Sequence, residues 1–159
     1  NISFVDPATG HLVERFHVPG RIQRLSLRHM ATAQRRRTWL AGQFEGSASA
    51  DTPLLATVSP EEGLGFPDSL VTATLSMRGY IGSLQSNDDG SRLAVSSPIG
   101  HSMIVIDTAT DRVVDTYPRT EVCGLGSQDG TFIASSFDGK FGNNEHDVHW
   151  DNHIGSVSF

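Results

Sequence analysis

The chain has 159 residues, 37% of them hydrophobic, which is enough for one domain with its own core. Twelve lysines and arginines against 18 aspartates and glutamates give a net charge of −6, so nucleic acid is not expected as a partner, because both surfaces would be negative. No apolar run reaches the roughly 20 residues that a membrane-spanning helix needs, and we expect no membrane insertion. The single cysteine, Cys123, excludes an internal disulfide and indicates neither an oxidising nor a reducing compartment.

The beginning of the chain predicts two strands joined by a turn. Ile2–Phe16 and Ser102–Tyr117 share one pattern, in which runs rich in β-branched residues flank a turn that starts at Asp6 in the first segment and Asp107 in the second. We interpret each segment as the third and fourth strands of a four-stranded unit. Neither an initiator methionine nor a charged-then-apolar signal segment opens the chain, so we expect the N-terminus of the whole protein to lie upstream.

A strand with alternating apolar and small residues occurs three times along the chain. A β-rich run precedes each copy, and in the last two copies an Asp-Gly turn joins run and strand, since glycine tolerates the positive φ of a tight hairpin. Arg35–Arg37 occupies this turn in the first copy, and we interpret it as a solvated hairpin tip. The strands are Thr38–Phe44, Arg92–Pro98 and Thr131–Phe137, and the preceding runs are Leu25–Met30, Tyr80–Leu84 and Val122–Gly126.

A repeated four-stranded unit of about 40–50 residues is typical of a β-propeller blade. The predicted fold class is therefore all-β, with about three four-stranded blades from a ring of about seven, and with no second domain. The predicted blades cover residues 1–21 (partial), 22–76, 77–118 and 119–159 (partial), and the last is expected to break off in its third strand, Ile154–Phe159. A sandwich of two sheets is the alternative, although a sandwich does not require a repeating unit.

The propeller fold predicts where a site would lie. In a propeller the first strand of each blade lines the central channel, and the second-to-third and fourth-to-first connections open on one face. We expect the second-to-third connections at Gly42–Gly46, Ser97–His101 and Asp138–His153. The candidates for lining the channel are Ser26, Arg28, His29, Tyr80, Ser83 and Cys123, of which Cys123 is interpreted as a packed thiol.

Several polar residues on this face are candidates for ligand binding. Arg28 offers a planar fork of donors for a carboxylate or phosphate, and His29 can titrate near neutral pH. The alternatives are that Arg28 or His29 satisfies backbone carbonyls between blades, that Gln43 and Glu45 cap a turn, and that Tyr80 packs. The predicted ligand-binding set is Arg28, His29, Gln43, Glu45, Tyr80, Asp151, Asn152 and His153.

The histidines near the end of the chain are weaker candidates for a metal site. On a helix His146, His149 and His153 would share a face, and on a strand His149, Asp151 and His153 would, so either arrangement could hold Zn²⁺ or Fe²⁺. A solvated loop is the alternative, and no other cofactor is expected. The chain contains no nucleophile elbow, phosphate loop or dinucleotide fingerprint, so no catalytic residue is assigned.

Six short motifs extend over nearly the whole chain, at Ser26–His29, Gly42–Gly46, Tyr80–Ser83, Ser97–Gly100, Val122–Gly124 and Trp150–His153. In this order and spacing they resemble the C-terminal half of the DUF1513 family, a group of uncharacterised bacterial propeller proteins. The resemblance implies a periplasmic protein exported by a twin-arginine signal, whose gene neighbours iron-uptake components such as imelysin-like and di-haem peroxidase-like proteins. The sequence departs from the family in three places: Glu121, where the family pattern has Asp, the arginine-rich turn Arg35–Arg37, and a longer loop before Trp150.

The expected function is therefore non-enzymatic binding on this face of a periplasmic propeller, linked to iron acquisition. The expected partner is a small anionic or metal-bearing ligand, or a periplasmic protein. A metal-dependent enzyme, either a hydrolase or an oxidoreductase, with its site on the same face is the first alternative. A scaffolding protein is the second.

Overall fold

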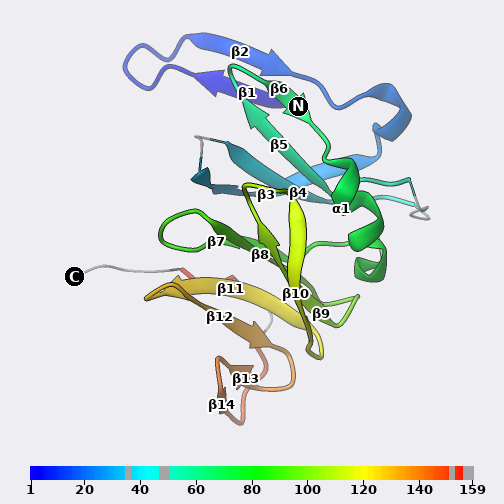
Figure 1. The fold of residues 1–159 in the computed structure, drawn as a ribbon, viewed down its shortest axis with the longest axis vertical. Helices are drawn as coiled ribbons and strands as arrows, with labels where there is room; N and C mark the ends of the chain where they lie inside the picture. The colour runs from blue at the N-terminus through cyan, green and yellow to red at the C-terminus, as the bar shows by residue number, and fades with distance from the viewer. Residues whose placement is uncertain (35–36, 47–50, 151–152, 156–159) are drawn as a thin grey trace.

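The structure is a computed structural model that describes residues 1–34, 37–46, 51–150 and 153–155. Fourteen strands in these residues form four antiparallel sheets (Figure 1). The first sheet pairs β1 (Ile2–Val5) with β2 (Leu12–Phe16). We name the other three blades A, B and C. Blade A contains β3 (Leu25–Thr32), β4 (Thr38–Phe44), β5 (Leu55–Ser59) and β6 (Gly63–Gly65). Blade B contains β7 (Ser83–Ser86), β8 (Arg92–Ser97), β9 (Ser102–Asp107) and β10 (Arg112–Pro118). Blade C contains β11 (Val122–Gln128), β12 (Thr131–Ser136), β13 (Lys140–Phe141) and β14 (Asn144–Glu145).

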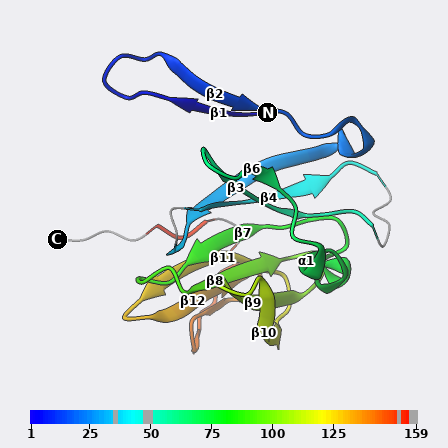
Figure 2. The same ribbon diagram turned by 45° about the horizontal axis from the view of Figure 1, so that its top comes forward.

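Within each blade the strands pair in chain order, from the first strand to the fourth. Neighbouring blades meet through their inner strands, because β3 contacts β7, and β11 contacts both β7 and β8. The sheets lie as successive layers, with β1–β2 at one end (Figure 2). Consecutive four-stranded antiparallel sheets that meet at their inner strands form the blades of a β-propeller, which confirms the predicted fold class. The number of blades in the complete ring stays a prediction.

The repeated segments form the predicted strands, except that β7 begins at Ser83 and leaves Tyr80–Gly82 of the predicted run outside the strand. The turns repeat as well. The Asp6 carboxylate accepts the backbone N–H of Ala8 at 2.8 Å, and the Asp107 carboxylate accepts that of Ala109 at 3.1 Å, so the same side chain closes both copies of this turn. Gly90 and Gly130 have φ of +70° and +74°, as the two Asp-Gly turns require.

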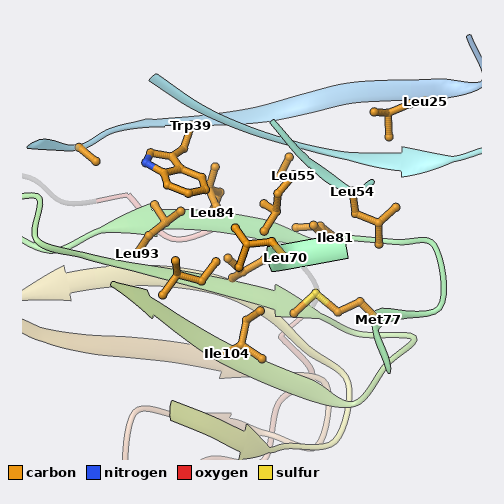
Figure 3. Packing of buried hydrophobic residues seen from close by; sticks show 14 of the residues in the cluster. Leu25, Trp39, Leu54, Leu55, Leu70, Met77, Ile81, Leu84, Leu93 and Ile104 are labelled. Atoms are coloured by element: carbon orange, nitrogen blue, oxygen red, sulfur yellow. The ribbon is translucent and has the colours of Figure 1, made fainter. Parts of the chain in front are cut away.

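The main hydrophobic core lies between blades A and B (Figure 3). Trp39 of β4 is fully buried there with Leu84 and Leu93 of blade B, because alternate residues of each strand point into the same layer. The helix α1 (Asp68–Ala73) adds Leu70 to this core, and 3₁₀ turns occur at Gly20–Ile22 and Leu75–Met77. No pattern in the sequence predicts α1. Among the described residues no helix has the length and apolar character needed to cross a membrane.

Arg37 corrects the prediction that the arginine-rich turn is solvated, while Arg35 and Arg36 lie outside the described residues. The Arg37 side chain is only 13% exposed. Its guanidinium donates to both carboxylate oxygens of Asp111 in blade B, at 3.0 and 3.1 Å, and to the Thr57 hydroxyl at 3.2 Å. It also lies over the Trp39 ring, 5.1 Å from its centroid. Arg37 therefore connects blade A to blade B.

The end of blade C differs from the prediction in two ways. The residues Asp138–His153 do not form one long connection, because they contain the short β13–β14 hairpin, and the turn between β12 and β13 is only Phe137–Gly139. Gly139, with φ of +89°, makes this early turn possible. The third strand of blade C is β13 and not the expected Ile154–Phe159, of which Ile154 and Gly155 lie outside any strand. Residues 156–159 of that expected strand lie outside the described part of the chain.

Candidate functional site

A pocket of about 480 Å³ lies where the connections of blades B and C meet. Second-to-third and fourth-to-first connections contribute to it. They are the segment before β7, the β8–β9 connection, the segment before β11 and the residues that follow β12. We call it the interblade pocket. Its lining residues are Arg78, Tyr80, Pro98, Ile99, His101, Glu121, Cys123, Phe137 and Trp150.

Three lining residues hold an unusual backbone conformation. Arg78, His101 and Glu121 have φ of 53°, 50° and 45°, and they make up three of the five non-glycine residues with positive φ in the described part of the chain. This left-handed conformation costs a side-chain-bearing residue about 1–2 kcal/mol, so it persists only where the surrounding structure imposes it. Such residues cluster at binding and catalytic sites.

Hydrogen bonds connect the segments that carry these residues. The Ser97 hydroxyl donates to the Met77 carbonyl at 3.0 Å and accepts the Gly100 N–H at 2.9 Å, which ties the β8–β9 connection to the segment before β7. A Cβ at Gly100 would lie 2.8 Å from the Met77 Cα, so only glycine allows this approach. The Glu121 N–H donates to Nδ1 of His101 at 3.1 Å, which ties the same connection to blade C.

The aromatic wall of the pocket comes from the segment around β13 and β14. The His149 ring stacks on the Phe137 ring, with centroids 4.4 Å apart, and its Nδ1 lies 2.7 Å from the Phe137 carbonyl oxygen. The Trp150 indole donates to the Gly139 carbonyl at 3.2 Å and packs on Phe141 at 5.4 Å. These contacts hold Trp150 and Phe137 at the pocket.

The charged side chains of the pocket have no ion-pair partner among the residues that the structure describes. Arg78 is exposed and Glu121 is half-buried. In the described residues neither side chain forms an ion pair, and the structure records no side-chain hydrogen bond for either. The pocket therefore offers a guanidinium and a carboxylate to a ligand, beside aromatic and apolar surface.

The predicted ligand-binding residues of blade A form a second group, on the channel side. The Arg28 guanidinium lies 3.6 Å from the Glu45 carboxylate and donates to the Ser26 hydroxyl at 3.2 Å, so it already has partners. Gln43 forms an isolated bridge with Tyr80, which also lines the interblade pocket. The structure thus brings Arg28 and Glu45 together.

The rings of His29 and His153 lie beside each other on the channel side, with centroids 5.0 Å apart. Burial is the main cause that lowers the pKa of His29, and the nearby charges of His153 and Arg28 lower it further, against an opposing hydrogen bond with the Ile81 backbone. Asp151 and Asn152 lie outside the described residues, so their assignment to the site stays a prediction.

The metal candidates do not gather in the structure. His149 contacts Phe137 and His146 packs on Trp150 at 6.0 Å, whereas His153 faces His29. In the described part of the chain no three His, Cys, Asp or Glu side chains are placed to hold a metal ion. Since Asp151 is outside that part, the triplet His149, Asp151 and His153 is untested.

Sequence reasoning missed Arg78, Glu121 and Phe137 as site residues, and it placed His101 in a connection without assigning it a role. No local pattern marks a positive φ at Arg or Glu. The only available signal was position in the chain. The motif Ser97–Gly100 directly precedes His101, and the motif Val122–Gly124 directly follows Glu121.

Comparison with known proteins gives a family and a fold. The model of a family described as "Protein of unknown function (DUF1513)" matches residues 1–157. No curated protein matches the sequence. A chain of the crystal structure of a mitotic checkpoint complex is similar, with a TM-score of 0.50 and 13% identity over 80% of this chain and 38% of that one. A chain of Kuenenia stuttgartiensis hydrazine synthase has a TM-score of 0.54 and 15% identity over 84% of this chain and 35% of that one. The chain thus spans less than two-fifths of either, and at these identities the likeness concerns the fold alone.

Proposed function

This chain belongs to the DUF1513 family of proteins of unknown function, and we propose that it binds a small anionic molecule in the interblade pocket. The observation that carries the proposal is the Arg78 guanidinium, which lines an aromatic pocket without a carboxylate partner among the described residues. A guanidinium is suited to bind a carboxylate, sulfonate or phosphate through two parallel hydrogen bonds.

The shape of the ligand follows from the rest of the lining. Tyr80, Phe137 and Trp150 provide flat apolar surface, and Pro98 and Ile99 extend it. Aromatic side chains bind flat rings through stacked or edge-to-face contacts. We therefore propose a ligand with a flat apolar body and one acidic group, of a size that about 480 Å³ can hold.

The backbone supports binding by a preformed site. Left-handed conformations at Arg78, His101 and Glu121 and the hydrogen bonds between their segments order the lining before any ligand arrives. A pocket ordered in advance does not pay the entropy of ordering its own loops when the ligand binds.

A periplasmic location and a role beside iron acquisition remain proposals that rest on the family resemblance alone. Cell fractionation of a producing bacterium tests the first, and transcript levels under iron limitation test the second. Recovery in the cytoplasm would contradict the location, and transcript levels that do not respond to iron would contradict the role.

The binding proposal is tested by calorimetric titration with 2-naphthoate and with its uncharged amide, 2-naphthamide. We expect saturable binding of the acid, at least about tenfold weaker binding of the amide, and a similar loss for the acid in Arg78→Gln. Arg112→Gln is the matched control, because Arg112 is exposed at the far end of β10 and should bind like wild type. Equal binding of acid and amide, equal binding by Arg78→Gln, or no saturable binding would overturn the proposal.

A further inference from the structure

A second cavity, of about 420 Å³, opens on the same face, and His101 lines both cavities. We call it the basic cavity. Its other lining residues are Pro118, Arg119, Thr120 and Lys140. We propose that the basic cavity binds an oxyanion, such as phosphate, sulfate or a carboxylate, through the Arg119 guanidinium with the help of Lys140.

Arg119 is held in place by blade C. Its Nε donates to the Ser136 hydroxyl at 3.1 Å, and Nη2 donates to the Ala134 carbonyl at 2.9 Å. Ser136 and Ala134 are both buried, so they anchor the guanidinium firmly. Its Nη1 has no hydrogen-bond partner recorded in the structure, and no carboxylate of the described residues lies within ion-pairing distance of Arg119. An ordered, half-buried guanidinium with free donors is a suitable anchor for an oxyanion.

The balance of charge around Arg119 is positive. Lys140 Nζ pairs with the Asp138 carboxylate at 2.9 Å, and the other Asp138 oxygen accepts the Ser136 hydroxyl at 2.7 Å. Arg119 and Lys140 thus share one carboxylate, Asp138, which pairs with Lys140 and only partly offsets the charge of Arg119. Burial lowers the pKa of Arg119, and Asp138 only partly opposes this, so a bound anion would stabilise a charge that the fold has partly removed from water.

The backbone brings the cavity walls together. The Arg119 N–H donates to the His101 carbonyl at 2.9 Å, so the connection before β11 and the β8–β9 connection meet beside the guanidinium. Thr120 adds a hydroxyl to the lining, which can donate to an anion. The inference does not depend on the proposed function, because Arg119 and Lys140 line the basic cavity and Arg78 lines the interblade pocket.

Titration of the protein with inorganic phosphate at low ionic strength, followed by calorimetry and by the amide signals of Thr120 and Glu121, tests the proposal. We expect saturable binding that weakens at least about tenfold in Arg119→Gln and about threefold in Lys140→Gln. Lys140→Gln leaves both Arg119 hydrogen bonds to blade C intact, so it tests the site without disturbing the fold. Arg112→Gln, the exposed control on β10, should bind phosphate like wild type.

Asp138→Asn should change the affinity for phosphate in the opposite direction. It removes the carboxylate that pairs with Lys140 and keeps an oxygen for the Ser136 hydroxyl, so phosphate should bind a few-fold more tightly. A purely structural Arg119 would give no such gain. Unchanged or weaker binding in Asp138→Asn, unchanged binding in both Arg119→Gln and Lys140→Gln, or no saturable phosphate binding would overturn the proposal.

The same titration shows which oxyanion the cavity takes. If a saturating amount of 2-naphthoate leaves phosphate binding unchanged, the cavity takes a free oxyanion. If 2-naphthyl phosphate displaces phosphate and its own affinity falls in both Arg119→Gln and Trp150→Phe, the cavity holds the acidic group of a ligand whose body fills the interblade pocket.

Discussion

Arg78 combines a binding group with a strained backbone, so its two properties can be separated by substitution. Arg78→Ala removes the guanidinium and keeps the steric strain of the left-handed conformation, whereas Arg78→Gly removes both the guanidinium and the strain. We expect neither variant to bind 2-naphthoate, and we expect Arg78→Gly to unfold with a free energy about 1 kcal/mol higher than Arg78→Ala, because glycine adopts this φ without steric cost. Urea denaturation of both variants measures the difference. Equal stabilities would mean that the conformation at Arg78 is not strained.

Among the arginines that form ion pairs in the described residues, Arg37 is the one whose loss should lower the free energy of unfolding most. Arg37→Met removes both hydrogen bonds to Asp111, which is itself only 24% exposed, and the bond to Thr57. Because Asp111 then keeps its charge without a partner, we expect a loss of about 2–4 kcal/mol in the free energy of unfolding. Arg112→Met, one residue after Asp111 and exposed, is the control and should change it by less than about 0.5 kcal/mol. A loss of that small size in Arg37→Met would show that the interblade pair contributes little.

At the scale of the element, the pairing of β3 with β4 depends on a close approach at Gly42. The register of this pair shifts between Leu27 and His29, and a Cβ at Gly42 would lie 3.1 Å from the Leu27 Cα and against the Ser26 carbonyl. Since both neighbours are backbone atoms of a paired strand, we expect Gly42→Ala to cost about 2–3 kcal/mol. Gly20→Ala is the control, because nothing lies within 4 Å of its added Cβ, and it should be nearly neutral. Thermal unfolding of both variants measures the difference. Equal melting temperatures would show that β3 and β4 can move apart enough to accept the added methyl group.

The strands could be predicted from sequence because each is specified by residues close together in the chain. Asp6 and Asp107 close equivalent turns, and Gly90 and Gly130 supply the φ that tight hairpins need. The helix α1 and the two-residue strands β13 and β14 could not be predicted in this way, since six or two residues carry too little periodicity to distinguish them from loop.

The candidate site was predictable only as a location. Propeller geometry indicates the face on which the interblade pocket lies, but Arg78, His101 and Glu121 meet through contacts between blades that no local pattern encodes. The buried position of Arg37 has the same origin, because its partner Asp111 is 74 residues away in the sequence. A run of arginines at a turn is ordinarily solvated, but here a carboxylate of the neighbouring blade binds Arg37.

At the scale of the whole molecule, His153 and Ile154 lie against the first strands of blades A and C, respectively. A Cβ at Gly126 of β11 would lie 3.1 Å from the Ile154 side chain, and the His153 ring faces His29 of β3. This contact joins two blades that are not neighbours, because blade B lies between them. Protonation of both histidines would place two positive charges close together, beside Arg28.

The protein should therefore lose stability in mild acid. Burial first, and then His153 and Arg28, lower the pKa of His29 in the folded protein below its ordinary value of 6.5, so the unfolded chain binds the proton more readily. The stability associated with neutral His29 is fully present above about pH 6.5 and is lost as the pH falls from there through the lowered pKa. We expect His29→Gln to flatten the pH dependence of urea denaturation between about pH 7.5 and 5, and we expect the exposed His11→Gln to leave it unchanged. In His153→Gln, NMR titration should show the pKa of His29 moving upward, because one repelling charge is gone. An unmoved pKa would mean that the two rings do not interact, and that His153 is not held against β3.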